Sequence, residues 1–381
     1  SRDQSRGPDA GAALQLGAKS GLSRRVSGTN GSMSSSIHEF GDRPDADRPG
    51  AAAIGRAPRG PDEANASAPR VGVIYNPRSH RNKGQDLALG DRERVMLATP
   101  EKRGQISSVL ADFAQHGIDY LIISGGDGTV RDVLTCGAEV FGDDWPVLAV
   151  LPKGKTNALN VDIGAPANWS LAEAIDAFET GSRVTRRPLD ISALTGESER
   201  LPVRGFILGA GAFTLGVRAG QEAHSMGLFD SLAVGMTSAW GVVQGMFGAN
   251  DNPWRRGVEM TVRLFPGGEK LAHSGHGDPS RRMILMASTL HRMPLGLKMF
   301  GTKRSGLKLA VLDRARRRMM ASLPLILAGW RPGWLERGGY HQRDVEAFEF
   351  EIGDQFILDG EAFPAGRYRV AQGPELTFVS A

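Results

Sequence analysis

The chain has 381 residues, 40% of them hydrophobic and 23% charged, so it is long enough for two domains with their own cores. Lys and Arg number 46 against 42 Asp and Glu, a net charge of +4, which suits anionic ligands or membranes without indicating nucleic acid. The single cysteine, Cys136, excludes an intrachain disulfide and a cysteine-ligated zinc site, and it fits a reducing cytoplasm.

The first 69 residues contain few large apolar side chains. Gly, Ser, Ala, Asp, Arg and Pro dominate this segment, and such a composition is typical of disorder. The chain begins without Met, and Met33 is its first methionine, which is compatible with an upstream extension of the true start. No apolar run long enough to span a membrane and no signal-peptide core is visible, so we expect a cytoplasmic protein.

Strand and helix patterns alternate from residue 70 to about residue 187. Short apolar, β-branched runs predict strands at 71–75, 121–124 and 146–152. Apolar residues at helical spacing predict helices around 106–113, over 129–140 and around 171–178. This alternation indicates an α/β domain with a mostly parallel sheet and helices on both faces.

A glycine-rich turn, GGDGT at 125–129, joins the strand 121–124 to the next helix. Its glycines allow another group to approach the backbone, and the helix N-terminus presents N–H groups that bind anions, phosphate above all. Asp127 would repel a bare phosphate unless a divalent cation such as Mg²⁺ lies between them. The alternative is that Asp127 only caps a neighbouring amide.

Two other turns follow strands of the same predicted sheet. Asn76 follows the strand 71–75, and Lys155 lies in the turn KGKTN after the strand 146–152. Ligands of parallel sheets bind beyond the carboxyl ends of the strands, so we expect Asn76, Asp127 and Lys155 to converge on one edge. Lys155 either neutralises a phosphate as a point charge or is a solvated loop lysine.

Two residues of the predicted helix 129–140 have structural interpretations. Thr129 and Asp132 have the spacing of a capping box, so the helix is predicted to begin at Thr129 and Asp132 is assigned to its cap rather than to catalysis. Cys136 is interpreted as a small core residue rather than a reactive thiol.

The pattern changes after about residue 187 to a second, mainly β domain. Strand-like segments separated by Gly, Pro and Asp turns occupy most of residues 188–381, and the last residues are candidates for packing back on the first domain. Two helical insertions are predicted, at 226–247 and 314–329. Pro324 lies inside the second and is predicted to kink or break it.

The order of four motifs resembles the diacylglycerol kinase catalytic-domain family, which includes bacterial soluble lipid kinases and resembles sphingosine kinases. The motifs are NPRS at 76–79, GGDGT at 125–129, PKGKTN at 152–157 and LDGE at 358–361. GGDGT is shared with NAD kinases and phosphofructokinase-like enzymes, whereas the full series is more specific. The resemblance covers residues 71–381 and implies an α/β nucleotide-binding domain, a following β-sandwich, and ATP in the cleft between them.

The resemblance also implies roles for individual residues. Asp359 would be the general base with Glu361 beside it, and Asp127 would serve the chemistry as a ligand of Mg²⁺, although the roles of Asp127 and Asp359 could be exchanged. The ATP-binding residues would be Asn76, Pro77, Arg78, Gly125, Gly126, Gly128, Thr129, Gly154, Lys155, Thr156 and Asn157.

This sequence departs from the family pattern at several positions. Lys155 and Thr156 stand where the family commonly has Thr and a small residue, and Asp132 stands where many members have Glu. The glycine-rich turn of the second domain corresponds here only to MPLGLKMFG, with Gly296.

Three functions are open at this point. The leading interpretation is an ATP-dependent kinase that phosphorylates a hydroxyl of a lipid such as diacylglycerol or a sphingoid base. An NAD kinase would explain GGDGT but not the LDGE ending. A catalytically silent, lipid-binding regulatory relative would explain the altered PKGKTN turn.

The helix 314–329 predicts how such a protein reaches a lipid. Arginines 316–318 precede an apolar stretch, and Trp330 and Trp334 follow, a combination typical of interfacial segments. We expect reversible docking on an anionic membrane, at the inner face, through the arginines and Trp334. The apolar half of the helix is expected to pack on the second domain, and nothing in the sequence indicates an oligomeric state.

Overall fold

The computed structural model describes residues 53–58, 68–79, 81–82, 94–194, 202–216, 253–302, 305–314 and 316–380. Most of the N-terminal segment that is predicted to be disordered, and the predicted helix 226–247, lie outside these ranges. Residues 53–58 are described and contact the first domain, because the N–H groups of Gly55 and Ala57 donate to the carbonyls of Val140 and Ala114, each at 2.9 Å.

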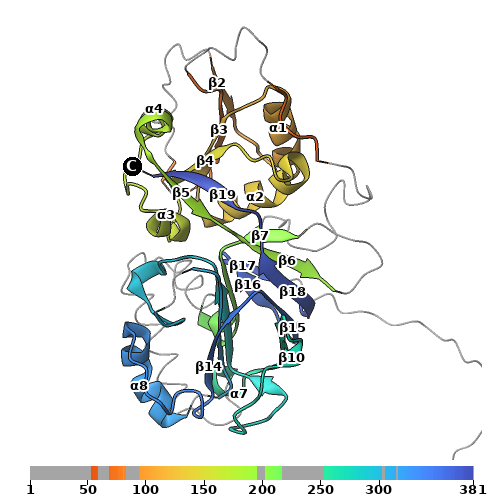
Figure 1. Ribbon diagram of the computed structural model, residues 1–381, viewed down its shortest axis with the longest axis vertical. Helices are drawn as coiled ribbons and strands as arrows, with labels where there is room; N and C mark the ends of the chain where they lie inside the picture. The colour runs from red at the N-terminus through yellow and green to blue at the C-terminus, as the bar shows by residue number, and fades with distance from the viewer. Residues whose placement is uncertain are drawn as a thin grey trace, which may run out of the picture. The chain divides into compact units, whose positions relative to one another are not determined.

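Strands and helices alternate through the first domain, as predicted (Figure 1). In chain order the elements are β1 (Val71–Tyr75), β2 (Val95–Ala98), α1 (Gly104–Gln115), β3 (Tyr120–Gly125), α2 (Asp127–Phe141), β4 (Val147–Pro152), α3 (Ala158–Ile163), α4 (Leu171–Thr180) and β5 (Ser182–Arg186). The sequence did not predict β2, whose residues are mostly part-exposed, or α3, whose six residues are too few to show a helical period.

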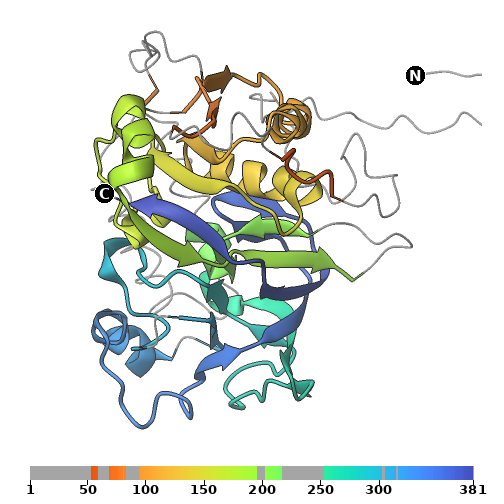
Figure 2. The same cartoon turned by 45° about the horizontal axis from the view of Figure 1, so that its top comes forward.

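The central sheet of this domain has the strand order β2-β1-β3-β4-β19-β5. The first four strands are parallel to one another. The C-terminal strand β19 (Leu376–Ser380) pairs parallel to β4 and antiparallel to β5, and both views show it crossing into this sheet (Figures 1 and 2). The prediction of an α/β domain with a mostly parallel sheet is confirmed.

Alternating side chains of the strands divide the core of this domain into two layers. On β3, Leu121 and Ile123 belong to the cluster that includes α1 and α2. Tyr120 and Ile122 belong to the cluster that includes α4, and the Tyr120 hydroxyl donates to the carbonyl of Ala174 at 2.8 Å. Helices therefore cover both faces of the sheet, which leaves the loops at the strand ends to form a site.

The second domain consists mainly of antiparallel strands in two sheets. The first has the order β10-β9-β15-β18-β6-β7, with β11 paired to β9, and the second has the order β14-β13-β12-β8-β16-β17. Side chains of both sheets, including Phe350 from the first and Phe356 from the second, form one apolar cluster, and these two rings meet edge to face at 5.3 Å. The sandwich-like second domain is thereby confirmed.

Most strands of the second domain lie in the strand-like segments of the sequence, but the sequence did not predict those at 269–270, 340–345 and 366–372. The strands of this domain are β6 (Leu189–Ala193), β7 (Val203–Gly205), β8 (Ile207–Gly211), β9 (Val258–Phe265), β10 (Glu269–Lys270), β11 (Arg281–Arg282), β12 (Ile284–Ser288), β13 (Leu307–Leu312), β14 (Tyr340–Val345), β15 (Ala347–Ile352), β16 (Phe356–Leu358), β17 (Glu361–Phe363) and β18 (Gly366–Gln372). The short helices α7 (Pro253–Arg256) and η2 (Pro294–Gly296) and the helix α8 (Arg317–Ala328) complete this domain.

Helix α8 runs without a break through Pro324, so the predicted break does not occur. Ile326 is fully buried and Leu323 and Leu327 pack partly against the core, as expected for the apolar half. Leu325, by contrast, is 58% exposed. No helix in the described part of the chain is long and apolar enough to cross a bilayer.

Candidate functional site

Three loops meet beyond the carboxyl ends of β1, β3 and β4, which are neighbours in the sheet. The Asn76 amide donates to the Thr129 hydroxyl at 2.8 Å, which joins the first loop to GGDGT. A Cβ added to Gly126 would lie 3.0 Å from the Gly154 Cα, so GGDGT and PKGKTN touch through their backbones. The structure therefore brings together the three turns that the sequence placed on one edge.

The loop after β1 is a tight turn that is closed by the side chain of Asn76. Its Oδ1 accepts the backbone N–H of Arg78 at 3.0 Å, and the side chains of Pro77 and Arg78 are exposed. The buried Asn82 donates from its amide to the carbonyl of Asn76 at 2.7 Å. This loop therefore presents backbone and amide groups beside Thr129, in a conformation fixed before any ligand binds.

The PKGKTN turn is shaped by Asn157 and Gly154. Asn157 has a left-handed backbone, with φ 50° and ψ 49°. Its side chain accepts the Gly154 N–H at 2.7 Å and donates to the Gly154 carbonyl at 3.0 Å. A Cβ at Gly154 would come within 2.6 Å of the Gly126 Cα, so only glycine allows this contact. Lys155 and Thr156, at the tip of the turn, are exposed.

Asp127 is the first residue of α2, and its carboxylate faces the start of α3. Its Oδ1 accepts the Ala158 N–H at 2.8 Å. Burial raises the pKa of Asp127, and backbone N–H groups at the start of α3 act in the opposite direction. The structure thus contains the capping contact that was the alternative role for Asp127. A metal-binding role for the same carboxylate stays a prediction.

Asp359 lies in the turn between β16 and β17, in the second domain, with a positive φ of 46°. Its carboxylate accepts the N–H of Phe206 at 3.0 Å and of Ile207 at 2.9 Å. Burial raises the pKa of Asp359 to about 7, the negative charge of Asp127 adds to this, and Arg131 counteracts it. Asp127 therefore lies near enough to Asp359 for its negative charge to raise the pKa of the Asp359 carboxyl.

Arg131 is the site residue that the sequence analysis missed. Its side chain is fully buried and its guanidinium donates to the carbonyl of Leu358, the residue before Asp359, at 3.2 Å and to Asp132 Oδ1 at 3.0 Å. The sequence did contain a signal for this residue. Arg131 and Asp132 lie between Val130 and Val133 on a largely apolar helix, and a buried charge needs a partner.

The capping interpretation of Asp132 is wrong. Helix α2 begins at Asp127 and its N-cap is Gly126, so Asp132 lies inside the helix rather than in its first turn. It is buried between two guanidinium groups, with Arg131 on Oδ1 at 3.0 Å and Arg103 on Oδ2 at 2.9 Å. Burial raises the pKa of Asp132, and both arginines oppose this increase.

Glu361 is held from the opposite domain by the same pair of arginines. The Arg103 guanidinium donates to Glu361 Oε1 at 3.0 Å, and the Arg131 guanidinium lies 3.8 Å from the same oxygen. Arg103 precedes α1 and Arg131 lies on α2, so the first domain fixes the turn that carries Asp359 and Glu361. Charged groups of both domains thus meet at one place.

The donor set fits a nucleotide triphosphate with Mg²⁺. The first N–H groups of α2 have no acceptor within the helix, as at every helix start, and they point toward the edge where Asn76 and the PKGKTN turn lie. The described residues contain no group of three or more His, Cys, Asp or Glu that could hold a metal ion by itself. Mg²⁺ on phosphates needs only one or two carboxylates, which Asp127, with Asp359 near it, can supply.

The fold places three loops together at one edge of the α/β sheet, beside the turn of the β domain that carries Asp359. Residues 70–192 match the family model of the diacylglycerol kinase catalytic domain. This match confirms the resemblance of the motifs for residues 70–192.

Similar proteins agree with this assignment. The lipid kinase YegS of Escherichia coli (strain K12) is 31% identical over 85 residues, which cover 20% of this chain and 28% of that relative. A crystal structure of a diacylglycerol kinase from Bacillus anthracis str. Sterne aligns with 83% of this chain and 98% of its own, with a TM-score of 0.54 and 13% identity. The likeness to this structure shows a common fold over both domains.

The raised pKa of Asp359 predicts a pH-dependent gain in stability on replacement by Asn. Because the folded-state pKa lies above the value of 3.8 for a free Asp, its contribution to stability is present below pH 4 and is lost as pH rises through about 7. We expect Asp359→Asn to raise the melting temperature at pH 8 and to change it little at pH 4. Calorimetry from pH 4 to pH 8 measures the melting temperatures of both proteins. A change in melting temperature that does not depend on pH would contradict the prediction.

Proposed function

We propose that this protein is an ATP-dependent lipid kinase that transfers the γ-phosphoryl group of ATP to a hydroxyl of a lipid such as diacylglycerol or a sphingoid base. The observation that carries the proposal is that Asp359, on the β domain, lies near enough to Asp127, on the glycine turn of the α/β domain, for the charge of Asp127 to raise the pKa of Asp359. Phosphoryl transfer requires phosphate positioning, charge neutralisation and a group that takes the hydroxyl proton. The match to the diacylglycerol kinase catalytic domain and the similarity to the lipid kinase YegS support the same activity.

The residues divide these tasks in the proposed mechanism. The N–H groups of Gly126, Gly128 and Thr129 and the side chain of Lys155 bind the phosphates. Asp127 would hold Mg²⁺, which would supply positive charge to neutralise the phosphates. Asp359 accepts the proton of the acceptor hydroxyl, because a carboxylate with a pKa of about 7 combines an ionised fraction at neutral pH with useful basicity.

Glu361, Arg103 and Arg131 act by positioning in this scheme. Arg131 holds the Leu358 carbonyl at 3.2 Å and so fixes the turn from which the Asp359 carboxylate projects. Arg103 holds Glu361 at 3.0 Å. The first domain, which binds ATP in this proposal, thereby orients the Asp359 carboxylate. Nucleotide binding and alignment of the lipid hydroxyl are linked in this way.

The contacts between the three loops support a nucleotide site formed by these loops. We assign Asn76, Pro77, Arg78, Gly125, Gly126, Gly128, Thr129, Gly154, Lys155, Thr156 and Asn157 to the ATP site, as the resemblance implies. Asn76 and Asn157 act through the turns that they close, and the exposed Lys155 and Thr156 are the groups of the second turn that reach a ligand.

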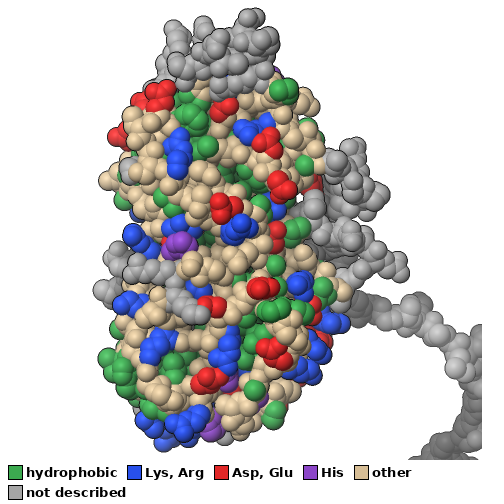
Figure 3. Space-filling model, in the orientation of Figure 1, with side chains coloured by type: hydrophobic (Ala, Val, Ile, Leu, Met, Phe, Trp, Pro, Cys, Tyr) green, Lys and Arg blue, Asp and Glu red, His purple; other side chains and the backbone are tan. Residues whose placement is uncertain are grey.

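The proposed substrate requires access to a membrane surface. Helix α8 carries Arg317 and Arg318 on its exposed side, Leu325 and Trp330 are exposed hydrophobic residues, and Figure 3 shows Lys and Arg beside hydrophobic side chains over this region. Such surfaces lie in membrane interfaces. We therefore propose reversible docking at the inner face of an anionic membrane by a protein that is otherwise cytoplasmic.

A phosphorylation assay tests the proposed function. Radiolabelled ATP and Mg²⁺ are supplied to the full chain with a mixed lipid extract, and in parallel with NAD. Label in the lipid fraction supports the proposal and identifies the acceptor by chromatography. Label in NAD only would establish an NAD kinase, and no label in either would favour a silent lipid-binding relative.

The charge of Arg131 predicts a shift in the pH dependence of this activity. Arg131 lowers the pKa of Asp359, so Arg131→Gln is expected to move the acidic limb of kcat/KM to higher pH, by on the order of one unit. Arg131→Lys, which keeps the charge, is expected to retain most of the original midpoint. The measurement is kcat/KM from pH 5 to 9, with Arg367→Gln, an exposed strand residue, as the control.

A purely structural role for Arg131 would lower activity equally at every pH. In that case the midpoint would stay in place for both variants, and the charge argument would be wrong even though the residue matters.

A further inference from the structure

A second anion-binding candidate lies far from Asp359, beside the start of α8. It is a cavity of about 130 Å³ lined by Arg316, Arg318, Met319, Trp334, Arg337 and Gly338. Liquid water occupies roughly 30 Å³ per molecule, so the cavity has room for a phosphate-sized anion but not for a nucleotide.

The cavity and Asp359 are at opposite ends of one sheet. Asp359 bonds Ile207, which pairs with Ser288 at the end of β12. Tyr340, two residues after Gly338, pairs with Leu312, beside the opposite end of β12. Strands of five or six residues span roughly 15–20 Å, so this cavity is not part of the proposed catalytic site.

The arginines of the cavity have few partners. Within the described residues, neither the Arg318 nor the Arg337 guanidinium has a hydrogen-bonded or ion-paired partner, and Arg316 contacts only the ring nitrogen Nε2 of His276, at 2.9 Å. Arg318 lies over the Trp334 ring at 4.3 Å, which holds its guanidinium in place. Three positive groups therefore line one cavity without a carboxylate among the described residues to neutralise them.

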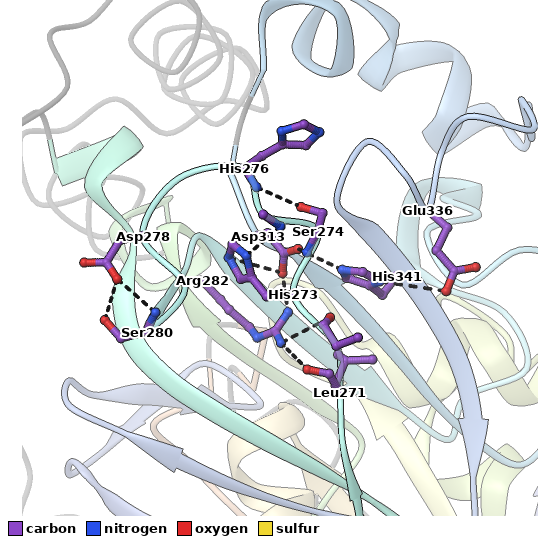
Figure 4. A network of polar contacts seen from close by, with 12 residues as sticks. Leu271, His273, Ser274, His276, Asp278, Ser280, Arg282, Asp313, Glu336 and His341 are labelled. Carbon is purple, nitrogen blue, oxygen red and sulfur yellow. Dashed lines mark hydrogen bonds and ion pairs between the residues drawn. The ribbon is translucent and has the colours of Figure 1, made fainter.

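The nearby carboxylates already have partners, and Figure 4 shows those of Asp313. Asp313 is buried, bonds the ring of His341 at 2.9 Å and pairs with Arg282. Glu336 pairs with Arg343. Both acids beside the cavity thus have partners away from it, and the positive charge of the cavity remains.

The same network fixes the loops around the cavity. Asp313 accepts the Ser274 N–H at 2.8 Å. Burial opposes ionisation of Asp313, but the hydrogen bonds of His341 and Ser274 and the charge of Arg282 outweigh it, so the pKa of Asp313 falls to about 2. The loop that carries His276 is therefore held at every physiological pH.

We propose that this cavity binds the phosphate group of an anionic phospholipid at the membrane surface. Guanidinium forks match phosphate oxygens in geometry and charge. The phosphate belongs to a lipid in this proposal because exposed apolar residues follow the arginines. Leu325 and the 46% exposed Trp330 would enter the membrane interface beside that phosphate. The inference deepens the membrane docking in the proposed function and rests on it for the choice of lipid.

Binding is measured on the full chain without nucleotide, so that the result does not depend on kinase activity. The probes are phosphatidylcholine vesicles with and without phosphatidylglycerol, monomeric short-chain phosphatidylglycerol, and inorganic phosphate alone. The test variant is Arg318→Gln with Arg337→Gln. The matched control is Arg263→Gln with Arg367→Gln, which removes the same charge from exposed strand positions.

We expect the test variant to bind anionic vesicles and the short-chain lipid roughly tenfold to thirtyfold more weakly than the unchanged protein, with the control nearly unaffected. Equal weakening in both variants would mean that net charge alone acts, and the cavity would be excluded as a site. Inorganic phosphate that binds as tightly as the lipid would overturn the lipid source. Circular dichroism confirms that each variant is folded. If the test variant is not, Arg337→Gln alone replaces it, with Arg367→Gln alone as its control and a smaller loss of binding expected.

Discussion

Asp359→Asn is expected to lower kcat by ~10²–10⁴-fold, the usual contribution of a general base, while ATP affinity stays nearly unchanged. The Asn side chain keeps an oxygen for the N–H groups of Phe206 or Ile207, so the turn is retained. It removes the proton acceptor, however. Initial rates at saturating lipid, together with nucleotide binding by calorimetry, separate the two effects.

The converse outcome for Asp359 would reassign the site. Weaker ATP binding with kcat preserved would put Asp359 in the nucleotide site and make Asp127 the candidate base. Glu351→Gln is a suitable control, because Glu351 is exposed on β15 of the same domain and is expected to leave both quantities unchanged.

Asp127→Asn is expected to abolish Mg²⁺-dependent turnover, with several kcal/mol added to the barrier at ~1.4 kcal/mol per tenfold in rate. The carboxylate also caps α3 through the Ala158 N–H. Because Asn still offers an oxygen to this N–H, the loss of stability should be below the ~1 kcal/mol of a removed cap. A Mg²⁺ titration of the rate, with thermal unfolding in parallel, distinguishes a metal role from a structural one.

A rate close to normal for Asp127→Asn would show that the carboxylate is only the cap of α3. Asp127→Ala adds a check, because it removes the cap as well. If stability falls in Asp127→Ala while Asp127→Asn stays active, the structural interpretation replaces the catalytic one.

Local sequence signals were sufficient to place the three loops of the candidate site at one edge of the sheet. A glycine-rich turn that follows an apolar strand can be located from the sequence alone. Because neighbouring parallel strands end at the same edge of a sheet, the loops of Asn76, Asp127 and Lys155 could be placed together without any knowledge of side-chain contacts. The strands of the second domain were equally visible, because alternating burial leaves a period of two in the sequence, as in β9.

Contacts between residues that lie far apart in the chain could not be predicted from the sequence. The partner of Arg131, the Leu358 carbonyl, is 227 residues away, and nothing near Arg131 in the chain identifies it. Asp132 was misassigned for a related reason. The spacing from Thr129 matches a capping box, but the helix begins two residues earlier. One of the two arginines that pair with Asp132, Arg103, precedes a different helix.

The C-terminal strand β19 has a consequence for how the chain matures. It lies between β4 and β5 in the sheet of the first domain, so residues 376–380 complete a domain whose other strands end at residue 186. Residues 376–380 are made after every other described strand, so the β4 edge of the first domain stays unpaired during synthesis until then, and an unpaired edge is a template for wrong association. The sheet of the first domain can therefore be completed only after the second domain has been made.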